Sequence, residues 1–298
     1  YIRPKMLNQV VEGFILLHGD VLWMVKGCEH PSDGFIAYPR YFRDGSKVKD
    51  PNNGLTIARR LGLAKYIDDL KMEVPVIPRY SIDGILNPFN RSLWPPLSGV
   101  ISEFLNEIGA LDSGDVGLTG SYLVSSVIPV RPRDLDIIIR DVREGLRIYD
   151  ALRELREDGI TKPYVESEDF GGTDPITRNE LLRHRVLEGV YRDKLVYSIR
   201  VLSCKQNTEL RPISYVDYYT GNIRITRALS PIAMPYTYEA LSNGGSVLIR
   251  SQRMRFSEIP VGTVLFLSNC RVEHYVSGET YLSLDNPECK VSIVGISH

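Results

Sequence analysis

The stretch VGLTGSYLVSSVIPVRPRDLDIIIR, residues 116–140, decides the fold and the function that we expect for this chain. Its pattern predicts a strand, a tight turn, a short helix, a loop and a second strand, in this order. The turn is Gly120-Ser121, and Pro129 ends the short helix that follows it. A Gly-Ser turn that leads into a helix offers free backbone N–H groups and a small hydroxyl, which suit the phosphates of a nucleoside triphosphate.

Two aspartates mark the second strand, which we predict at residues 135–139. Asp134 and Asp136 are two positions apart, so the alternation of a strand places both carboxylates on one face. Like charges held this close are unfavourable without a cation. Carboxylate oxygens suit Mg²⁺ or Mn²⁺, and Mg²⁺ commonly takes one or two carboxylates together with substrate phosphates. We therefore predict a metal site beside a triphosphate site, which is the arrangement that nucleotidyl transfer requires.

The turn and the two aspartates together resemble the signature of the DNA polymerase β-like nucleotidyltransferase superfamily, a Gly-Ser pair, a short spacer and Asp-apolar-Asp on an apolar strand. The signature covers about 25 residues of this chain. A looser similarity to archaeal predicted nucleotidyltransferases runs from about residue 10 to about residue 205. It includes His30-Pro31 and the segment IAYPRY at residues 36–41.

This resemblance implies a Mg²⁺-dependent (or Mn²⁺-dependent) enzyme that moves a nucleoside monophosphate from an NTP to an acceptor hydroxyl. Asp134 and Asp136 would be the catalytic residues and the metal ligands. The nucleotide would be bound by Gly120, Ser121, Lys194 and Arg200, of which the last two are candidates to neutralise charge on the leaving pyrophosphate. The sequence does not identify the acceptor, for which RNA and DNA are the candidates.

Active members of this superfamily usually carry a third carboxylate on a later strand, and the strand that we predict at residues 195–202 has none. Three explanations remain open. The third acid comes from Asp193 or from the loop at residues 166–169, or two carboxylates suffice and substrate phosphates complete the metal's coordination. Alternatively, the site is degenerate, and the chain is a non-catalytic module that binds nucleotide, RNA, DNA or a protein partner.

We predict an α+β fold, in which a nucleotidyltransferase-type mixed sheet with helices is flanked by two β-rich parts. Residues 1–94 would form a small antiparallel β domain with one helix at residues 56–70 and a Pro-rich connector. Residues 95–210 would form the catalytic domain, and residues 211–298 a small β-barrel or sandwich.

Basic residues give three further candidate contacts for phosphate or nucleic acid. The first is the group between residues 178 and 205, which includes a basic helix face and is our best candidate for a triphosphate or acceptor patch. The second is the pair Arg253 and Arg255, which alternation would place on one face of a C-terminal strand. The third is His30 and Arg40 near the N-terminus. In the last two cases, an ordinary structural role is an equal alternative.

Composition sets the outer limits. The chain has 298 residues, of which 43% are hydrophobic and 24% charged, and its net charge of −1 gives no overall basic field for nucleic acid. We expect no membrane span and a cytoplasmic location. The four cysteines form no C-x-x-C pair, so a structural zinc is not expected. We expect free thiols, with a disulfide between Cys270 and Cys289 as the alternative.

Overall fold

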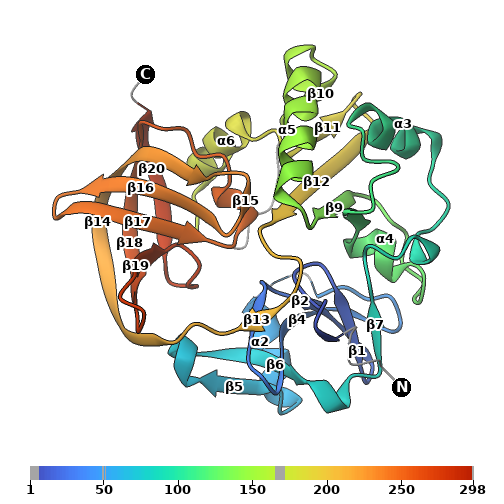
Figure 1. Cartoon of the computed structure of the whole chain (residues 1–298), viewed down its shortest axis with the longest axis horizontal. Coiled ribbons are helices and arrows are strands. Elements are labelled where there is room, and N and C mark those ends of the chain that lie inside the picture. Colours follow the sequence, from blue (N-terminus) through green and yellow to red (C-terminus); the bar gives the residue numbers. More distant parts are fainter. Residues whose placement is uncertain (1–6, 49, 51, 165–171, 297–298) are drawn as a thin grey trace.

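The computed structural model describes residues 7–48, 50, 52–164 and 172–296. Figure 1 shows three sheets, with the N-terminal sheet below and the central and C-terminal sheets side by side above it. The helices lie mainly around the central sheet. The candidate site lies where the N-terminal sheet meets the central one.

The N-terminal sheet has six strands in the order β5-β6-β4-β2-β1-β7, and every neighbouring pair is antiparallel. One face buries Trp23 and Phe35, whose rings are fully enclosed, beside the helix α2 (Asn52–Arg60). The strands are β1 (Ile15–His18), β2 (Val21–Val25), β4 (Gly34–Phe42), β5 (Ala64–Ile67), β6 (Met72–Pro78) and β7 (Gly84–Leu86).

The helix predicted at residues 56–70 is wrong in its second half. The helix α2 ends at Arg60, and residues 64–67 form β5, which pairs with β6. Gly62 lies between them with φ +70°, a conformation that glycine adopts readily and that ends the helix. Strand pairing of residues 64–67 with β6 is therefore more favourable than the helix that their apolar periodicity predicts.

The central sheet has the order β10-β11-β12-β9-β8, and only the pair of β12 and β9 within this path is parallel. The helices α3 (Gly99–Glu107) and α5 (Val142–Glu157) pack their apolar residues into its core, for example Phe104 and Leu152. The strands are β8 (Val116–Leu118), β9 (Leu135–Ile139), β10 (Thr161–Lys162), β11 (Glu188–Tyr191) and β12 (Leu195–Leu202), and α4 (Gly120–Val124) follows β8.

The C-terminal sheet closes on itself. Its path runs β14-β16-β17-β19-β18-β20, and an additional pairing of β14 with β18 completes a ring. Closure pairs strand edges that would otherwise be exposed. The strands are β14 (Ile213–Ser230), β16 (Tyr236–Ser242), β17 (Gly245–Ser251), β18 (Thr263–Tyr275), β19 (Thr280–Ser283) and β20 (Lys290–Ile296). Among the smaller elements, β3 (Glu29–His30) pairs with β13 (Thr208–Glu209). The others are β15 (Ala233–Met234) and α6 (Pro175–His184).

The predicted α+β class, with a nucleotidyltransferase-type sheet as its centre, is wrong for this chain. Strands make up 42% and helices 22% of the described residues, and the strands form several sheets. Long antiparallel pairing accounts for much of this strand content, since β14 and β18 have 18 and 13 residues and pair with each other. The domain boundaries at residues 94 and 210 stay a prediction.

Two disulfides replace the free thiols that we expected, so that expectation is wrong. Cys28 is bonded to Cys204, with Cα atoms 6.4 Å apart, and Cys270 to Cys289, with Cα atoms 4.3 Å apart. The first bond joins the loop after β2 to the segment after β12, across 176 positions of sequence. It therefore links the N-terminal sheet to the central sheet.

Loss of the bond between Cys28 and Cys204 should destabilise the protein. A crosslink across so long a loop restricts the unfolded chain strongly, so Cys28→Ala/Cys204→Ala should lower the free energy of unfolding by about 2–5 kcal/mol. Chemical denaturation of the oxidised proteins measures this difference, and the two single variants should lose the same amount as the double variant. Four free thiols in denatured, unreduced wild-type protein would contradict both disulfides.

Candidate functional site

The candidate site is formed at the contact between α4 and the N-terminal sheet. Leu123 and Val124 of α4 pack against Leu22 and Tyr41 of that sheet in one buried cluster. The Thr119 hydroxyl, directly before α4, donates a hydrogen bond of 2.6 Å to a backbone carbonyl of the N-terminal segment, that of Gly13. The Gly-Ser turn is therefore held from both sides.

Asp136 lies directly against the Gly-Ser turn, as the sequence predicts. Gly120 has φ +60°, and a Cβ atom added to it would lie 2.1 Å from Asp136 Oδ2. Only glycine leaves room for the carboxylate at this distance and adopts this backbone conformation without strain. The backbone N–H of Thr119 also donates to the Asp136 carbonyl, at 2.9 Å. The structure thus brings the two halves of the predicted motif together.

The other oxygen of Asp136 accepts a hydrogen bond of 2.6 Å from the hydroxyl of Ser198. Ser198 lies on β12 and is the register partner of Asp136 on β9. Burial raises the pKa of Asp136, although Ser198 and the charge of Arg200 act in the opposite direction. The site therefore contains a carboxylate that its neighbours stabilise only in part.

Asp134 lies in a bend directly before β9 and its side chain is exposed, whereas Asp136 lies on the strand and is half-buried. Their charges nevertheless interact, and the negative charge of Asp134 contributes to the raised pKa of Asp136. Ser121 is the second residue of α4, and its hydroxyl has no hydrogen-bond partner among the described residues.

Arg200 lies behind Asp136, but Glu12 holds its guanidinium. The Glu12 carboxylate also contacts Lys26, at 3.3 Å, and accepts a hydrogen bond of 2.6 Å from the N–H of Gly27. Burial alone would raise the pKa of Glu12, but the two cations and this N–H lower it. Burial disfavours the charged form of Arg200, but the carboxylates of Glu12 and Asp136 raise its pKa. Arg200 therefore stabilises the fold around Asp136, and its guanidinium is not free to bind the leaving pyrophosphate.

The other predicted site residues lie elsewhere. Lys194 is exposed in the turn between β11 and β12, four positions before Ser198, which is roughly 13 Å along a strand. Asp193, one candidate for the third acid, lies in the same turn and forms an ion pair with Lys162 of β10, at 2.8 Å. The second candidate, the loop at residues 166–169, lies outside the described residues.

The basic group between residues 178 and 205 does not form one surface. Arg192 donates to two carboxylates of α3, at 2.9 and 2.6 Å. Arg185 is buried and paired with Glu188. Arg200 belongs to the ion cluster around Glu12. Carboxylates from three different elements therefore separate these cations.

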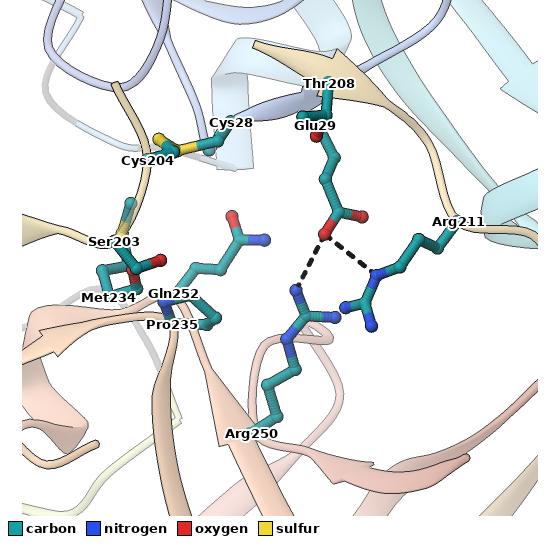
Figure 2. Close-up of a pocket in the computed structure, with 11 residues that line it drawn as sticks. Cys28, Glu29, Ser203, Cys204, Thr208, Arg211, Met234, Pro235, Arg250 and Gln252 are labelled. Atoms are coloured by element: carbon teal, nitrogen blue, oxygen red, sulfur yellow. Dashed lines mark hydrogen bonds and ion pairs between the residues drawn. A yellow bond between two sulfur atoms is a disulfide. The ribbon is translucent and has the colours of Figure 1, made fainter. Parts of the chain in front are cut away.

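The C-terminal arginines are also used in the fold. The strand β17 ends at Ser251, so Arg253 and Arg255 do not alternate along a strand, and Arg253 donates to the Asp285 carbonyl at 2.7 Å. Arg250 is mostly buried and converges with Arg211 on Glu29, at 3.3 and 3.1 Å, as Figure 2 shows.

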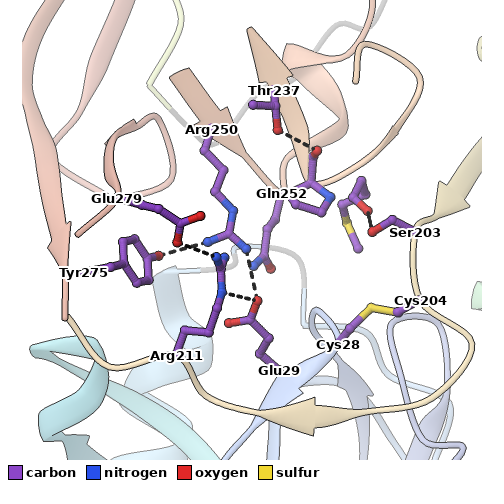
Figure 3. Close-up of polar contacts among 12 residues, drawn as sticks. Cys28, Glu29, Ser203, Cys204, Arg211, Thr237, Arg250, Gln252, Tyr275 and Glu279 are labelled. Atoms are coloured by element: carbon purple, nitrogen blue, oxygen red, sulfur yellow. Dashed lines mark hydrogen bonds and ion pairs between the residues drawn. A yellow bond between two sulfur atoms is a disulfide. The ribbon is translucent and has the colours of Figure 1, made fainter. Parts of the chain in front are cut away.

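These ion pairs line a cavity of about 300 Å³ where the three sheets meet. The bond between Cys28 and Cys204 lies on another wall of the cavity (Figure 2). Figure 3 shows that Arg250 also donates to the Tyr275 hydroxyl, at 2.9 Å, and that Glu279 lies beside Arg211. The two guanidiniums therefore already have carboxylate partners. The ion pairs that line this cavity mainly connect the N-terminal part of the chain to the ring of the C-terminal sheet.

His30 has an ordinary structural role on β3, which pairs with β13. Its ring is buried edge-on against Phe35, and its Nδ1 accepts a hydrogen bond of 3.3 Å from the N–H of Ile36. Burial lowers the pKa of His30 to about 4, so the ring is neutral at pH 7.

Sequence analysis missed three residues that shape the site. Glu12, Lys26 and Ser198 contact or position its charged groups, and none was assigned a role. The sequence did contain one indication of this ion cluster. Glu12 is a single acid within the apolar run VVEGFILL, residues 10–17. A lone charge among buried residues needs partners, but one of the two cations that bind it, Arg200, is almost two hundred positions away.

Comparison with known proteins adds no family. No protein-family model matches this chain, and no curated protein matches it. Within the described residues, no helix combines the length and apolar character that a membrane span requires.

The donor set fits a small hard cation. Asp134 and Asp136 supply carboxylate oxygens, and the raised pKa of Asp136 indicates that its charge is not fully balanced by the chain. No cluster of three or more potential metal ligands occurs in the described part of the chain. A metal at this place would accordingly depend on two carboxylates, water and substrate oxygens.

The buried ion cluster should make stability depend on pH. Glu12→Gln leaves Lys26 and Arg200, both partly exposed, without their partner, so it should lower the free energy of unfolding at pH 7 by about 1–3 kcal/mol. Because the folded-state pKa of Glu12 is lowered, its contribution is present above the unfolded value near 4.5 and is lost as the pH falls below it. Denaturation curves between pH 7 and pH 3 should therefore converge for the two proteins. A constant difference across this range would contradict the assignment.

The Asp136 carboxylate should cost stability until a cation binds. Its folded-state pKa is raised, so its ionisation destabilises the metal-free fold as the pH rises above the unfolded value near 3.8. At pH 7 in EDTA, Asp136→Asn should melt at the same temperature as the wild type or a few degrees higher. Excess MgCl₂ should raise the melting temperature of the wild type and of the control Asp150→Asn, which changes an exposed residue of α5. An equal Mg²⁺ effect on Asp136→Asn would contradict a metal site.

Proposed function

We propose that this chain binds an NTP with Mg²⁺ or Mn²⁺ at Asp134 and Asp136 and transfers the nucleoside monophosphate to an acceptor hydroxyl. One observation carries the proposal: the half-buried Asp136 carboxylate, held by Ser198, lies against Gly120 of the Gly-Ser turn. A protein used only as a scaffold gains nothing from a partly balanced, half-buried carboxylate near a second one. A bound cation would balance the two carboxylates, and a polyphosphate would occupy the Gly-Ser turn.

The described residues divide the work as follows. Asp136 and Asp134 hold the metal, which when bound neutralises phosphate charge and stabilises the charge that develops during transfer. Ser198 fixes the orientation of Asp136 through its hydrogen bond, and Gly120 leaves room for that carboxylate. The hydroxyl of Ser121 is available to a phosphate oxygen.

In the transfer step, the acceptor oxygen forms a bond to the α-phosphorus, and the bond from that phosphorus to the β-phosphate oxygen breaks. Pyrophosphate leaves, and the proton of the acceptor hydroxyl passes to solvent. RNA and DNA are the proposed acceptors. We also propose a cytoplasmic location for the protein.

A second candidate function is nucleotide binding without turnover. Ser198 favours it, because this residue faces Asp136 from the neighbouring strand, where a third carboxylate would complete the metal site. A hydroxyl orients a carboxylate but does not act as a base at pH 7. The two functions share one binding site and differ only in the release of pyrophosphate.

Calorimetric titration with each of the four ribonucleoside triphosphates, with and without Mg²⁺, tests the binding site. The wild type should bind at least one triphosphate in a metal-dependent manner, and Asp134→Asn/Asp136→Asn should lose this binding because both proposed metal ligands are gone. A pyrophosphate-release assay with total cellular RNA as acceptor then separates the candidates. Release of pyrophosphate supports nucleotidyl transfer. Triphosphate binding without pyrophosphate release, with either RNA or DNA as acceptor, supports the non-catalytic function. If no triphosphate binds under any condition, both are wrong.

A further inference from the structure

A hairpin of the N-terminal sheet reaches the candidate site. Tyr41, near the end of β4, pairs with Lys47 in an isolated antiparallel bridge, and the N–H of Phe42 donates to the Ser46 carbonyl at 2.9 Å. We call residues 40–48 the β4 hairpin. Its tip touches the loop after α4, since a Cβ atom added to Gly45 would lie 2.8 Å from the carbonyl oxygen of Pro129.

The packing on both sides fixes the place of the β4 hairpin relative to the aspartates. Tyr41 is buried in the cluster that contains Leu123, Val124 and Ile128, on α4 and directly after it. Burial raises the pKa of Tyr41, and the negative charges of Asp136 and Asp134 add to this effect. The hairpin is therefore close enough to both carboxylates for their charges to act on it.

Two cations of the β4 hairpin have no carboxylate partner. In the described part of the chain, neither Arg40 nor Lys47 forms a salt bridge, and Arg40 donates to the Val48 carbonyl, at 3.0 Å. Burial of its ammonium group and the neighbouring Arg40 lower the pKa of Lys47, while Asp136 and Asp134 act in the opposite direction. By contrast, the nearby cations Lys26 and Arg200 are both bound to Glu12.

Two carboxylates on one side and two unpaired cations on the other suit a metal-bound polyphosphate. Charge-assisted hydrogen bonds from arginine and lysine are the usual contacts of phosphate oxygens. The bound metal would relieve the repulsion between the aspartates, and the phosphate oxygens would relieve that between Arg40 and Lys47.

We propose that Arg40 and Lys47 bind the β- and γ-phosphates of the nucleotide, so that the N-terminal sheet supplies half of the triphosphate site. This inference rests on the proposed function. It assigns the triphosphate contacts to the β4 hairpin in place of Lys194, which is remote, and Arg200, which Glu12 occupies.

The test compares binding of the triphosphate that the wild type prefers with binding of the corresponding monophosphate, both with Mg²⁺, by calorimetry. Lys47→Met and Arg40→Met should each weaken triphosphate binding about 10-fold to 100-fold, because each removes a charge-assisted contact. Monophosphate binding should change less than about twofold, since that ligand lacks the β- and γ-phosphates. Lys47→Arg should retain most of the triphosphate affinity.

The matched control is Arg43→Met in the same hairpin. Arg43 donates to the Gly19 carbonyl at 2.9 Å and lies near Asp20, so it is engaged away from the aspartates, and its loss should leave both affinities unchanged. If the wild type binds triphosphate and Lys47→Met and Arg40→Met bind it equally well, the inference is wrong while the proposed function stands. An equal loss for mono- and triphosphate also overturns it, because the cations would then support the fold. If the wild type binds no triphosphate, the proposed function itself fails.

Discussion

The buried carboxylate of Glu12 is the interaction on which the candidate site depends. It joins Lys26 and Gly27 of the N-terminal sheet to Arg200 of the central sheet, and the charge of Arg200 in turn acts on Asp136. Each of these charges is expensive to bury alone, and together they are compensated. Since the cluster connects two sheets, it also fixes how the N-terminal sheet sits over α4.

A second constraint is the contact between Gly120 and Asp136. The carboxylate occupies the volume that a side chain would need at position 120, so the turn and the strand β9 must be placed together. Ser198 then orients the carboxylate from β12. The result is a rigid, partly balanced negative charge, and rigidity is what a metal ligand requires. Asp134, exposed in the bend before β9, is the less constrained of the two acids.

Elsewhere, most of the basic residues that we considered as phosphate or nucleic-acid contacts form ion pairs or hydrogen bonds within the chain. Arg250 and Arg211 share Glu29 at the cavity between the sheets, and Arg192 is held by α3. This pairing explains why a count of basic residues is a poor guide to a binding surface here. Lys47 of the β4 hairpin differs from these cations, because the charges of Asp136 and Asp134 act on it although it forms no salt bridge among the described residues.

The sequence by itself determined the local elements around the site. The strands β9 and β12 have the bounds that the apolar runs at residues 135–139 and 195–202 predict, and the turn at Gly120 meets Asp136, because short-range patterns and steric limits act within each segment. Only the tertiary structure decided the rest. The fold class, the two disulfides and the partners of Glu12 depend on residues that are far apart in sequence. Long-range strand pairing likewise turned the expected helix around β5 into sheet, and it placed Ser198, rather than an acid, beside Asp136. Contacts of this kind gain their energy from burial between segments, and no local pattern encodes which segments meet.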